Sequence, residues 1–123
     1  MKYLLMIYTD EGADSCQNGE AQRRVMDAYF AYTNQGREAG VILGGDALHP
    51  TSTATTVRVR DGKLLTTDGP FAETKEQLGG YYLVDCSNLD EAIDWARRIP
   101  GASTGCVEVR PIVDFSEWRS ATS

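Results

Sequence analysis

The stretch that decides the fold is residues 66–86, TTDGPFAETKEQLGGYYLVDC. It begins with the turn residues of 68–70, continues through the polar residues of 73–76, and ends in the apolar run 81–86. Glycine permits unusual backbone angles and proline fixes φ, so this order predicts a turn, a loop and then a buried strand. The loop is therefore either a reactive segment or only a connection between two strands.

Helical patterns lie on both sides of that stretch. Apolar residues at helical spacing predict one helix over residues 19–39 and a second one over residues 89–99, behind the capping residue Asn88. The buried face of the first helix is predicted to consist of Val25, Tyr29, Tyr32, Gly36 and Ala39. That of the second is predicted to consist of Leu89, Ala92, Ile93, Ala96 and Ile99.

Strand patterns fill most of the remaining chain. Strands are predicted at residues 2–8, 41–45, 56–60, 63–67, 81–86 and 105–112. Asp61-Gly62 is a strong hairpin signal, so the two strands around it should pair antiparallel. The order of elements predicts an α+β protein with the ferredoxin-like βαββαβ fold, an extra β-hairpin, and both helices on one face of an antiparallel sheet.

The opposite sheet face should also be apolar. We expect it to carry Tyr8, either Tyr81 or Tyr82, and the valines at 57 and 59. A surface of this kind is too apolar to remain in contact with water, and a second copy packed sheet to sheet is the simplest cover. The sequence therefore predicts a homodimer.

Size and charge bound the class of protein. The 123 residues predict a single domain over residues 1–123. The net charge of −6 and the pI of about 4.7 disfavour direct nucleic-acid binding. The opening residues 1–12 resemble a strand more than a secretory signal, and no apolar run reaches the roughly 20 residues that span a bilayer. We expect a cytoplasmic protein with no membrane partner.

Few residues are candidates for chemistry. Asp68 is a possible acid or base, although a turn role is more common for such a residue. His49, the single histidine, is the default proton-transfer group, although it is also explained as a solvated loop residue. Glu73 and Lys75 can pair on one side of an extended loop. Three cysteines without metal-type spacing, and glycines that match no cofactor fingerprint, predict no metal and no cofactor.

Two aromatic residues are candidates for lining a pocket. Tyr29 lies on the predicted inner face of the first helix, where it either packs in the core or positions a ligand with its hydroxyl. Phe71 follows the turn at 68–70 and either fills the core or contacts a ligand.

The sequence resembles the YCII-related family, specifically its DGPF-domain branch. The resemblance rests on KYLLMIY at 2–8, ATTVRVRDGK at 54–63, DGPFAETKEQLGGYYLVDC at 68–86, DEAIDWARRIP at 90–100 and VEVRPI at 107–112. It implies a dimeric α+β barrel. Better-studied relatives resemble enzymes with a helix histidine near an aspartate, and this chain has Tyr29 and Glu38 at those places, so the dyad is not carried over.

The residues and the resemblance together leave three functional hypotheses. The first is a small-molecule-binding protein or acid–base enzyme, with Asp68 and His49 as proton-transfer groups and with Tyr29, Glu38, Phe71, Glu73 and Lys75 around the ligand. The second is a non-catalytic regulatory module associated with an extracytoplasmic-function sigma factor, as the genomic neighbours of the DGPF branch imply. The third is that the 68–86 motif only maintains the fold and the dimer.

Overall fold

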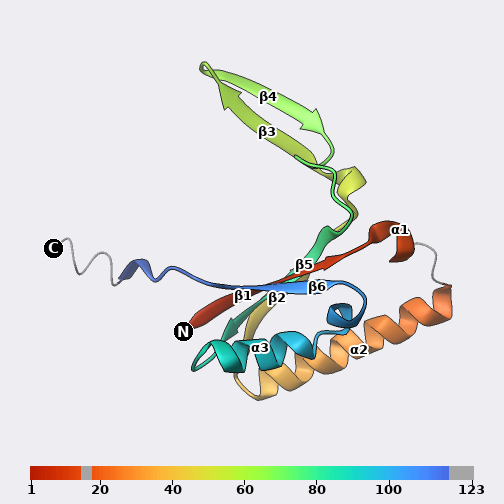
Figure 1. The fold of residues 1–123 in the computed structure, drawn as a ribbon, viewed down its shortest axis with the longest axis vertical. Coiled ribbons are helices and arrows are strands. Elements are labelled where there is room, and N and C mark those ends of the chain that lie inside the picture. The colour runs from red at the N-terminus through yellow and green to blue at the C-terminus, as the bar shows by residue number, and fades with distance from the viewer. Residues whose placement is uncertain (15–17, 117–123) are drawn as a thin grey trace.

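The computed structural model describes residues 1–14 and 18–116 of the chain. Its body is a four-stranded antiparallel sheet with the strand order β2-β5-β1-β6. These strands are β1 (Lys2–Thr9), β2 (Ile42–Ala47), β5 (Gln77–Asp85) and β6 (Cys106–Pro111). The helices α2 (Gly19–Glu38) and α3 (Leu89–Arg97) both lie on one side of this sheet (Figure 1). The predicted ferredoxin-like α+β fold is confirmed.

The core lies between the sheet and the two helices. Alternate residues of the central strand β1 point into it, and Tyr3, Leu5 and Ile7 are buried there. Across the core, the hydroxyl of Tyr32 on α2 donates a 2.9 Å hydrogen bond to the carbonyl oxygen of Trp95 on α3. This bond joins the two helices inside the apolar layer.

Helix α3 begins as predicted and buries part of the predicted face, since Ala92, Ala96 and Ile99 are buried. The Asn88 side chain accepts a 2.9 Å hydrogen bond from the Glu91 amide at its N-terminus. Trp95 is buried with the two alanines on its inner face, whereas Leu89 and Ile93 are exposed. The prediction for those two residues was wrong because the large indole of Trp95 turns the helix so that its own side is innermost.

Helix α2, the first of the two predicted helices, contacts the sheet along only part of its length. Of the predicted face, Tyr32 and Gly36 are buried, but Val25 is 39% exposed and Ala39 is exposed. The predicted burial of Val25 and Ala39 was therefore wrong. A Cβ atom built on Gly36 would lie 2.1 Å from Cδ1 of Ile42, so α2 and β2 touch at that point. Residues 22–28, in the N-terminal half of α2, are exposed.

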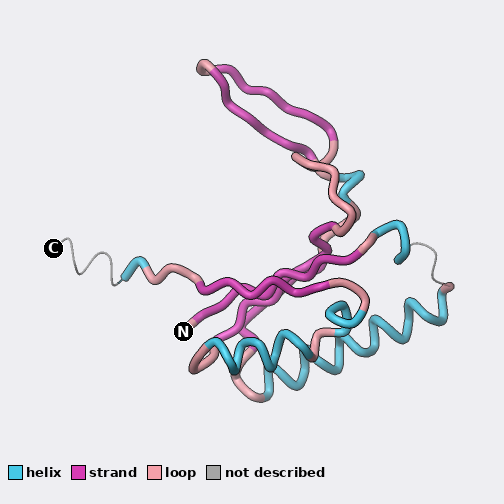
Figure 2. Tube along the Cα trace, in the orientation of Figure 1, coloured by secondary structure: helices cyan, strands magenta, loops and turns pink. Residues whose placement is uncertain are grey.

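The extra hairpin stands apart from the body. Strands β3 (Thr55–Arg60) and β4 (Lys63–Asp68) form their own two-stranded sheet, and Figures 1 and 2 show it projecting away from the rest of the chain. Asp61 and Gly62 both have positive φ, as the predicted turn requires. The two valines at 57 and 59 were expected on the large sheet and instead lie on this hairpin, which we call the arm.

The close approach at Gly36 gives a prediction about stability. Gly36→Ala should lower the free energy of unfolding by up to about 2 kcal/mol, because overpacking of the added methyl group against Ile42 costs about 1–3 kcal/mol and the gain in helix propensity offsets about 1 kcal/mol of that cost. Urea denaturation measures it. Gly19→Ala in the same helix is the control, since a Cβ there meets no atom within 4 Å and stability should not fall. Equal behaviour of the two variants would contradict the packing role.

Candidate functional site

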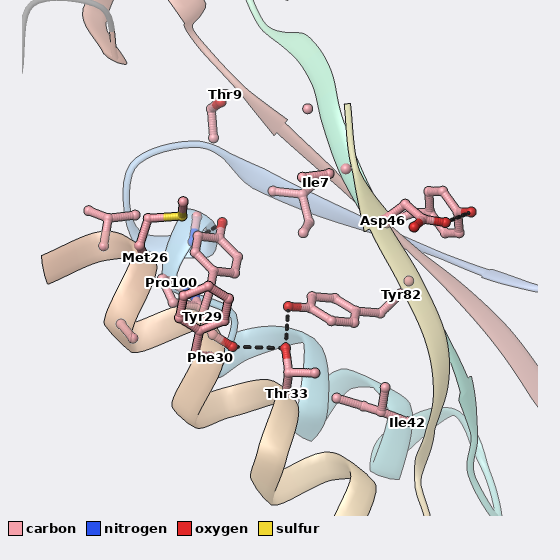
Figure 3. A pocket seen from close by; sticks show the side chains of 18 of the residues that line it. Ile7, Thr9, Met26, Tyr29, Phe30, Thr33, Ile42, Asp46, Tyr82 and Pro100 are labelled. Atoms are coloured by element: carbon pink, nitrogen blue, oxygen red, sulfur yellow. Dashed lines mark hydrogen bonds between the residues drawn. The ribbon is translucent and has the colours of Figure 1, made fainter. Parts of the chain in front are cut away.

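An open cleft lies between α2 and the sheet. Its volume is about 1120 Å³, and the short helix η2 (Pro100–Ser103) forms part of its lining. Its walls are mostly apolar and include Ile7, Met26 and Phe30 (Figure 3). Val25 also lines it. A concave site with apolar walls and a few placed polar groups is the usual form of a small-molecule site.

The sheet wall of the cleft is built from glycine. Gly44, Gly45, Gly79 and Gly80 line it, on the neighbouring strands β2 and β5. A Cβ atom on Gly45 would lie 2.8 Å from the ring of Tyr82, so a side chain at that place cannot be accommodated without displacement. The ladder shifts register beside Gly79, which confirms a bulge where the paired glycines enter β5. A ligand can therefore lie directly against the strand backbone.

Two hydroxyl groups meet inside the cleft. Oγ1 of Thr33 donates a 2.8 Å hydrogen bond to the carbonyl oxygen of Tyr29, one turn earlier in α2. Oγ1 of Thr33 also lies 2.8 Å from the hydroxyl oxygen of Tyr82 (Figure 3). A threonine has a single hydroxyl proton. Because Thr33 gives it to Tyr29, Tyr82 donates to Thr33, and the Tyr82 oxygen keeps lone pairs that can accept a hydrogen bond.

The Tyr29 side chain has a structural partner. Its hydroxyl oxygen accepts a 3.0 Å hydrogen bond from the amide of Gly101 in η2. A Cβ on Gly101 would lie 2.6 Å from that hydroxyl, so only glycine permits this approach. Tyr29 therefore holds η2 against α2 at the edge of the cleft.

The charged residues that line the cleft are Arg24, Arg37 and Asp46. Figure 3 shows Asp46 on the side of β2 that faces away from α2. There its carboxylate accepts a 2.7 Å hydrogen bond from the hydroxyl of Tyr81, and this bond raises the pKa of Tyr81. The side chains that give the cleft its charge are therefore the two arginines, which favour a ligand with negative charge or electron-rich oxygen atoms.

The predicted site residues do not converge in one place. Tyr29 lines the cleft, whereas Glu38 is the last residue of α2 and is exposed outside it. Asp68 ends β4 opposite Thr55, at the root of the arm. His49 lines a separate hollow of about 430 Å³ beside that root.

The loop after Asp68 is exposed. Phe71 is 81% exposed and lines the same small hollow as His49, so the expectation that it fills the core was wrong. Glu73 and Lys75 are exposed, and the ion pairs found among the described residues do not include one between them. Within residues 1–14 and 18–116, no group of three histidine, cysteine or acidic side chains is arranged to hold a metal ion.

Sequence reasoning missed most of the cleft. Met26, Phe30, Thr33 and Arg37 recur at 4-3-4 spacing on α2 and form a stripe beside the predicted inner face. That second stripe was the available signal, together with the paired glycines of β2 and β5. The sequence analysis left open which of Tyr81 and Tyr82 faces away from the helices, and the structure places Tyr82 in the cleft and Tyr81 against Asp46.

Comparisons with known proteins agree with this architecture. The YCII-related domain model matches residues 1–116, and the chain belongs to that family. An uncharacterized protein of Rhizobium meliloti (strain 1021) is 46% identical over 114 residues, which cover 91% of this chain and 92% of that protein.

A similar fold occurs in a solved enzyme structure. It is 5-chloro-2-hydroxyhydroquinone dehydrochlorinase from Burkholderia phenoliruptrix, in complex with 2,5-dihydroxybenzoquinone. The TM-score is 0.50 at 16% sequence identity, over 95% of this chain and 98% of that one. At this identity the likeness concerns the fold.

Among the described helices of this protein, none is long and apolar enough to cross a membrane.

The buried hydroxyl of Tyr32 predicts a loss of stability at alkaline pH. The Tyr32 ring packs edge-on against Tyr82 with the centroids 5.2 Å apart, and burial raises the pKa of its hydroxyl. The folded chain thus keeps Tyr32 neutral, while the unfolded chain ionises it near pH 10, so its contribution is present below pH 10 and declines as pH rises above it. The destabilisation caused by Tyr32→Phe should therefore shrink by about 1 kcal/mol between pH 9 and pH 11 in urea denaturation.

Ile99→Val provides the control for that experiment, because Ile99 is buried in the same core as Tyr32 and has no group that titrates. A Tyr32→Phe effect that is the same at both pH values would contradict the assigned environment of Tyr32.

Proposed function

We propose that this protein binds a small, flat, hydroxylated ring compound in the cleft between α2 and the sheet. The observation that carries the proposal is the pair Thr33–Tyr82, whose hydrogen-bond order leaves the Tyr82 oxygen as an acceptor for a ligand hydroxyl. Phe30 and Met26 supply apolar contact area, and the glycine wall leaves room for a ring to lie flat on the backbone.

The polar groups of the cleft narrow the class of ligand. Arg24 and Arg37 offer donors, and Tyr82 offers an acceptor. A compound that combines hydroxyl and carbonyl or anionic oxygens on one ring would satisfy both kinds of partner. The compound in the enzyme of similar fold, 2,5-dihydroxybenzoquinone, has these features and is therefore a suitable probe.

Catalysis is a separate question from binding. Asp68 and His49 lie at the root of the arm and are not among the described residues that line the cleft. Acid–base chemistry at Asp68 and His49 stays a prediction of the sequence. The sigma-factor association likewise stays a prediction, with the net charge of −6 and the family resemblance as its support.

Blocking the cleft tests the proposed binding site. Ala28 and Ala31 are both exposed on α2, and only Ala28 lines the cleft. Ala28→Trp should weaken binding of 2,5-dihydroxybenzoquinone at least tenfold, because the indole occupies the ligand volume, whereas Ala31→Trp should bind like the parent protein. Isothermal titration calorimetry gives the dissociation constants, and thermal melting checks that both variants are folded. Equal affinity in the two variants, or no binding by the parent at millimolar probe, would refute the site.

We further infer that the protein is a homodimer that packs through the helix-free face of its large sheet. That face carries an apolar centre of half-buried side chains, namely Leu4, Met6, Tyr8, Tyr81 and Leu83. Asp46, Glu108 and Arg110 surround it with charge. An apolar centre with a polar rim is the usual pattern of a protein interface.

A charge placed in this apolar centre should separate the subunits. Leu83→Lys should convert a dimeric parent into a monomer in size-exclusion chromatography with light scattering, because burial of an unpaired lysine is costly. Ile93→Lys is the control, since Ile93 is exposed on α3 at the other side of the molecule. A parent protein that is monomeric at 100 μM, or a Leu83→Lys variant that stays dimeric, would contradict this interface.

A further inference from the structure

The arm has two different faces. Its register places Val59 opposite Leu64 and Val57 opposite Thr66, so these residues share one face. Arg60 opposes Lys63 and Arg58 opposes Leu65 on the other face. The arm is therefore amphipathic, with an apolar face of Val57, Val59 and Leu64 and a basic face of Arg58, Arg60 and Lys63.

The apolar face has no cover within the described chain. Val57, Val59 and Leu64 are 58%, 61% and 67% exposed. A two-stranded hairpin is marginally stable in water unless a third element packs on it. An exposed apolar face on such a hairpin is therefore best explained as one half of an interface.

The direction of the arm indicates where the other half lies. In Figure 1, α2 and α3 lie on one side of the large sheet and the arm rises on the other side. That side is the helix-free face, with Leu83 and Met6 in its centre. A body seated on the helix-free face would thus stand next to the arm.

We propose that the arm packs its apolar face onto the body of a second copy of this chain, which is seated on the helix-free sheet face. The inference rests on the dimer proposed above and adds a second contact to it. In a twofold dimer each copy supplies one sheet face and one arm, so both uncovered apolar surfaces are buried in the same assembly.

The distribution of charge favours contact of the arm with the body of the partner over contact between the two arms. Residues 55–68 contain three basic residues, Arg58, Arg60 and Lys63, and two acidic ones, Asp61 and Asp68, so the arm carries +1. The rest of the −6 chain therefore carries −7. An arm is attracted to the acidic body of the partner, whereas two arms repel each other.

The area of the two surfaces also favours a joint interface. Strands of six residues at about 3.3 Å each and four strands about 4.8 Å apart give a sheet face of about 400 Å². Two such faces bury about 800 Å², which is within the range of crystal contacts, whereas stable interfaces need about 1,200–2,000 Å². One face of a six-residue hairpin covers about 200 Å², and it buries about the same area on the partner. The two arms of a dimer therefore add about 800 Å², which brings the total buried area to about 1,600 Å².

Sedimentation equilibrium of the full chain tests the role of the arm. Leu64→Asp places a charge on its apolar face and should raise the dimer dissociation constant at least tenfold. Thr67→Asp makes the same change of net charge on the opposite face of β4 and should leave the constant within threefold of the parent value. Both residues are exposed in the single chain, so neither substitution disturbs the core.

Hydrogen exchange of the parent protein provides a measurement without any substitution in the arm. Amides of residues 55–68 should be protected at 100 μM and should lose protection in the monomeric Leu83→Lys variant, because a lone hairpin opens readily. Equal protection in that variant would overturn the proposal. A dimer that Leu83→Lys dissociates and Leu64→Asp leaves intact would overturn the arm contact alone, and a monomeric parent would overturn it together with the dimer. The dimer dissociation constants and the amide protection are both measured without a ligand, so they are independent of ligand binding in the cleft.

Discussion

The contact between Gly36 and Ile42 is the constraint on which the cleft depends. The absent side chain at Gly36 lets the C-terminal half of α2 approach β2 so closely that a single methyl group would clash. Farther along the helix, Tyr29 reaches η2 and holds it by the Gly101 amide, so the helix and the sheet are kept apart at that level. The C-terminal part of α2 is thus fixed on the sheet at Gly36, its middle is tied to η2 at Tyr29, and the cleft lies between α2 and the sheet.

The two faces of the large sheet carry different side chains, although they alternate along the same strands. Tyr81 and Tyr82 are neighbours in β5, and strand alternation sends them to opposite sides. Tyr82 enters the cleft and donates to Thr33, while Tyr81 donates to Asp46 on the helix-free face. A shift of β5 by one residue would exchange the two tyrosines, so the bulge beside Gly79 sets the side chains of the cleft and of the proposed dimer face together.

Local sequence signals predicted the elements but not how they are placed in space. The Asp61-Gly62 turn, the Asn88 cap and the strand alternation each depend on neighbouring residues, and the structure confirms all three. The exposed position of Val25 depends on where α2 leaves the sheet. That angle is set by Gly36 and Ile42, which are close in space without any local pattern that pairs them, so a helical stripe alone could not reveal it.

The residues of the candidate site were likewise hard to predict from local sequence signals. Sequence reasoning sought titratable groups and selected Asp68 and His49, which lie at the root of the arm. The cleft instead contains hydroxyl groups, glycine backbone and aromatic rings, whose value for binding appears only when α2 and β5 face each other. Thr33 has no significance in the sequence until its proton is assigned to the Tyr29 carbonyl. With that proton assigned, the Tyr82 oxygen becomes an acceptor, and an apolar space gains a polar group that can select its ligand.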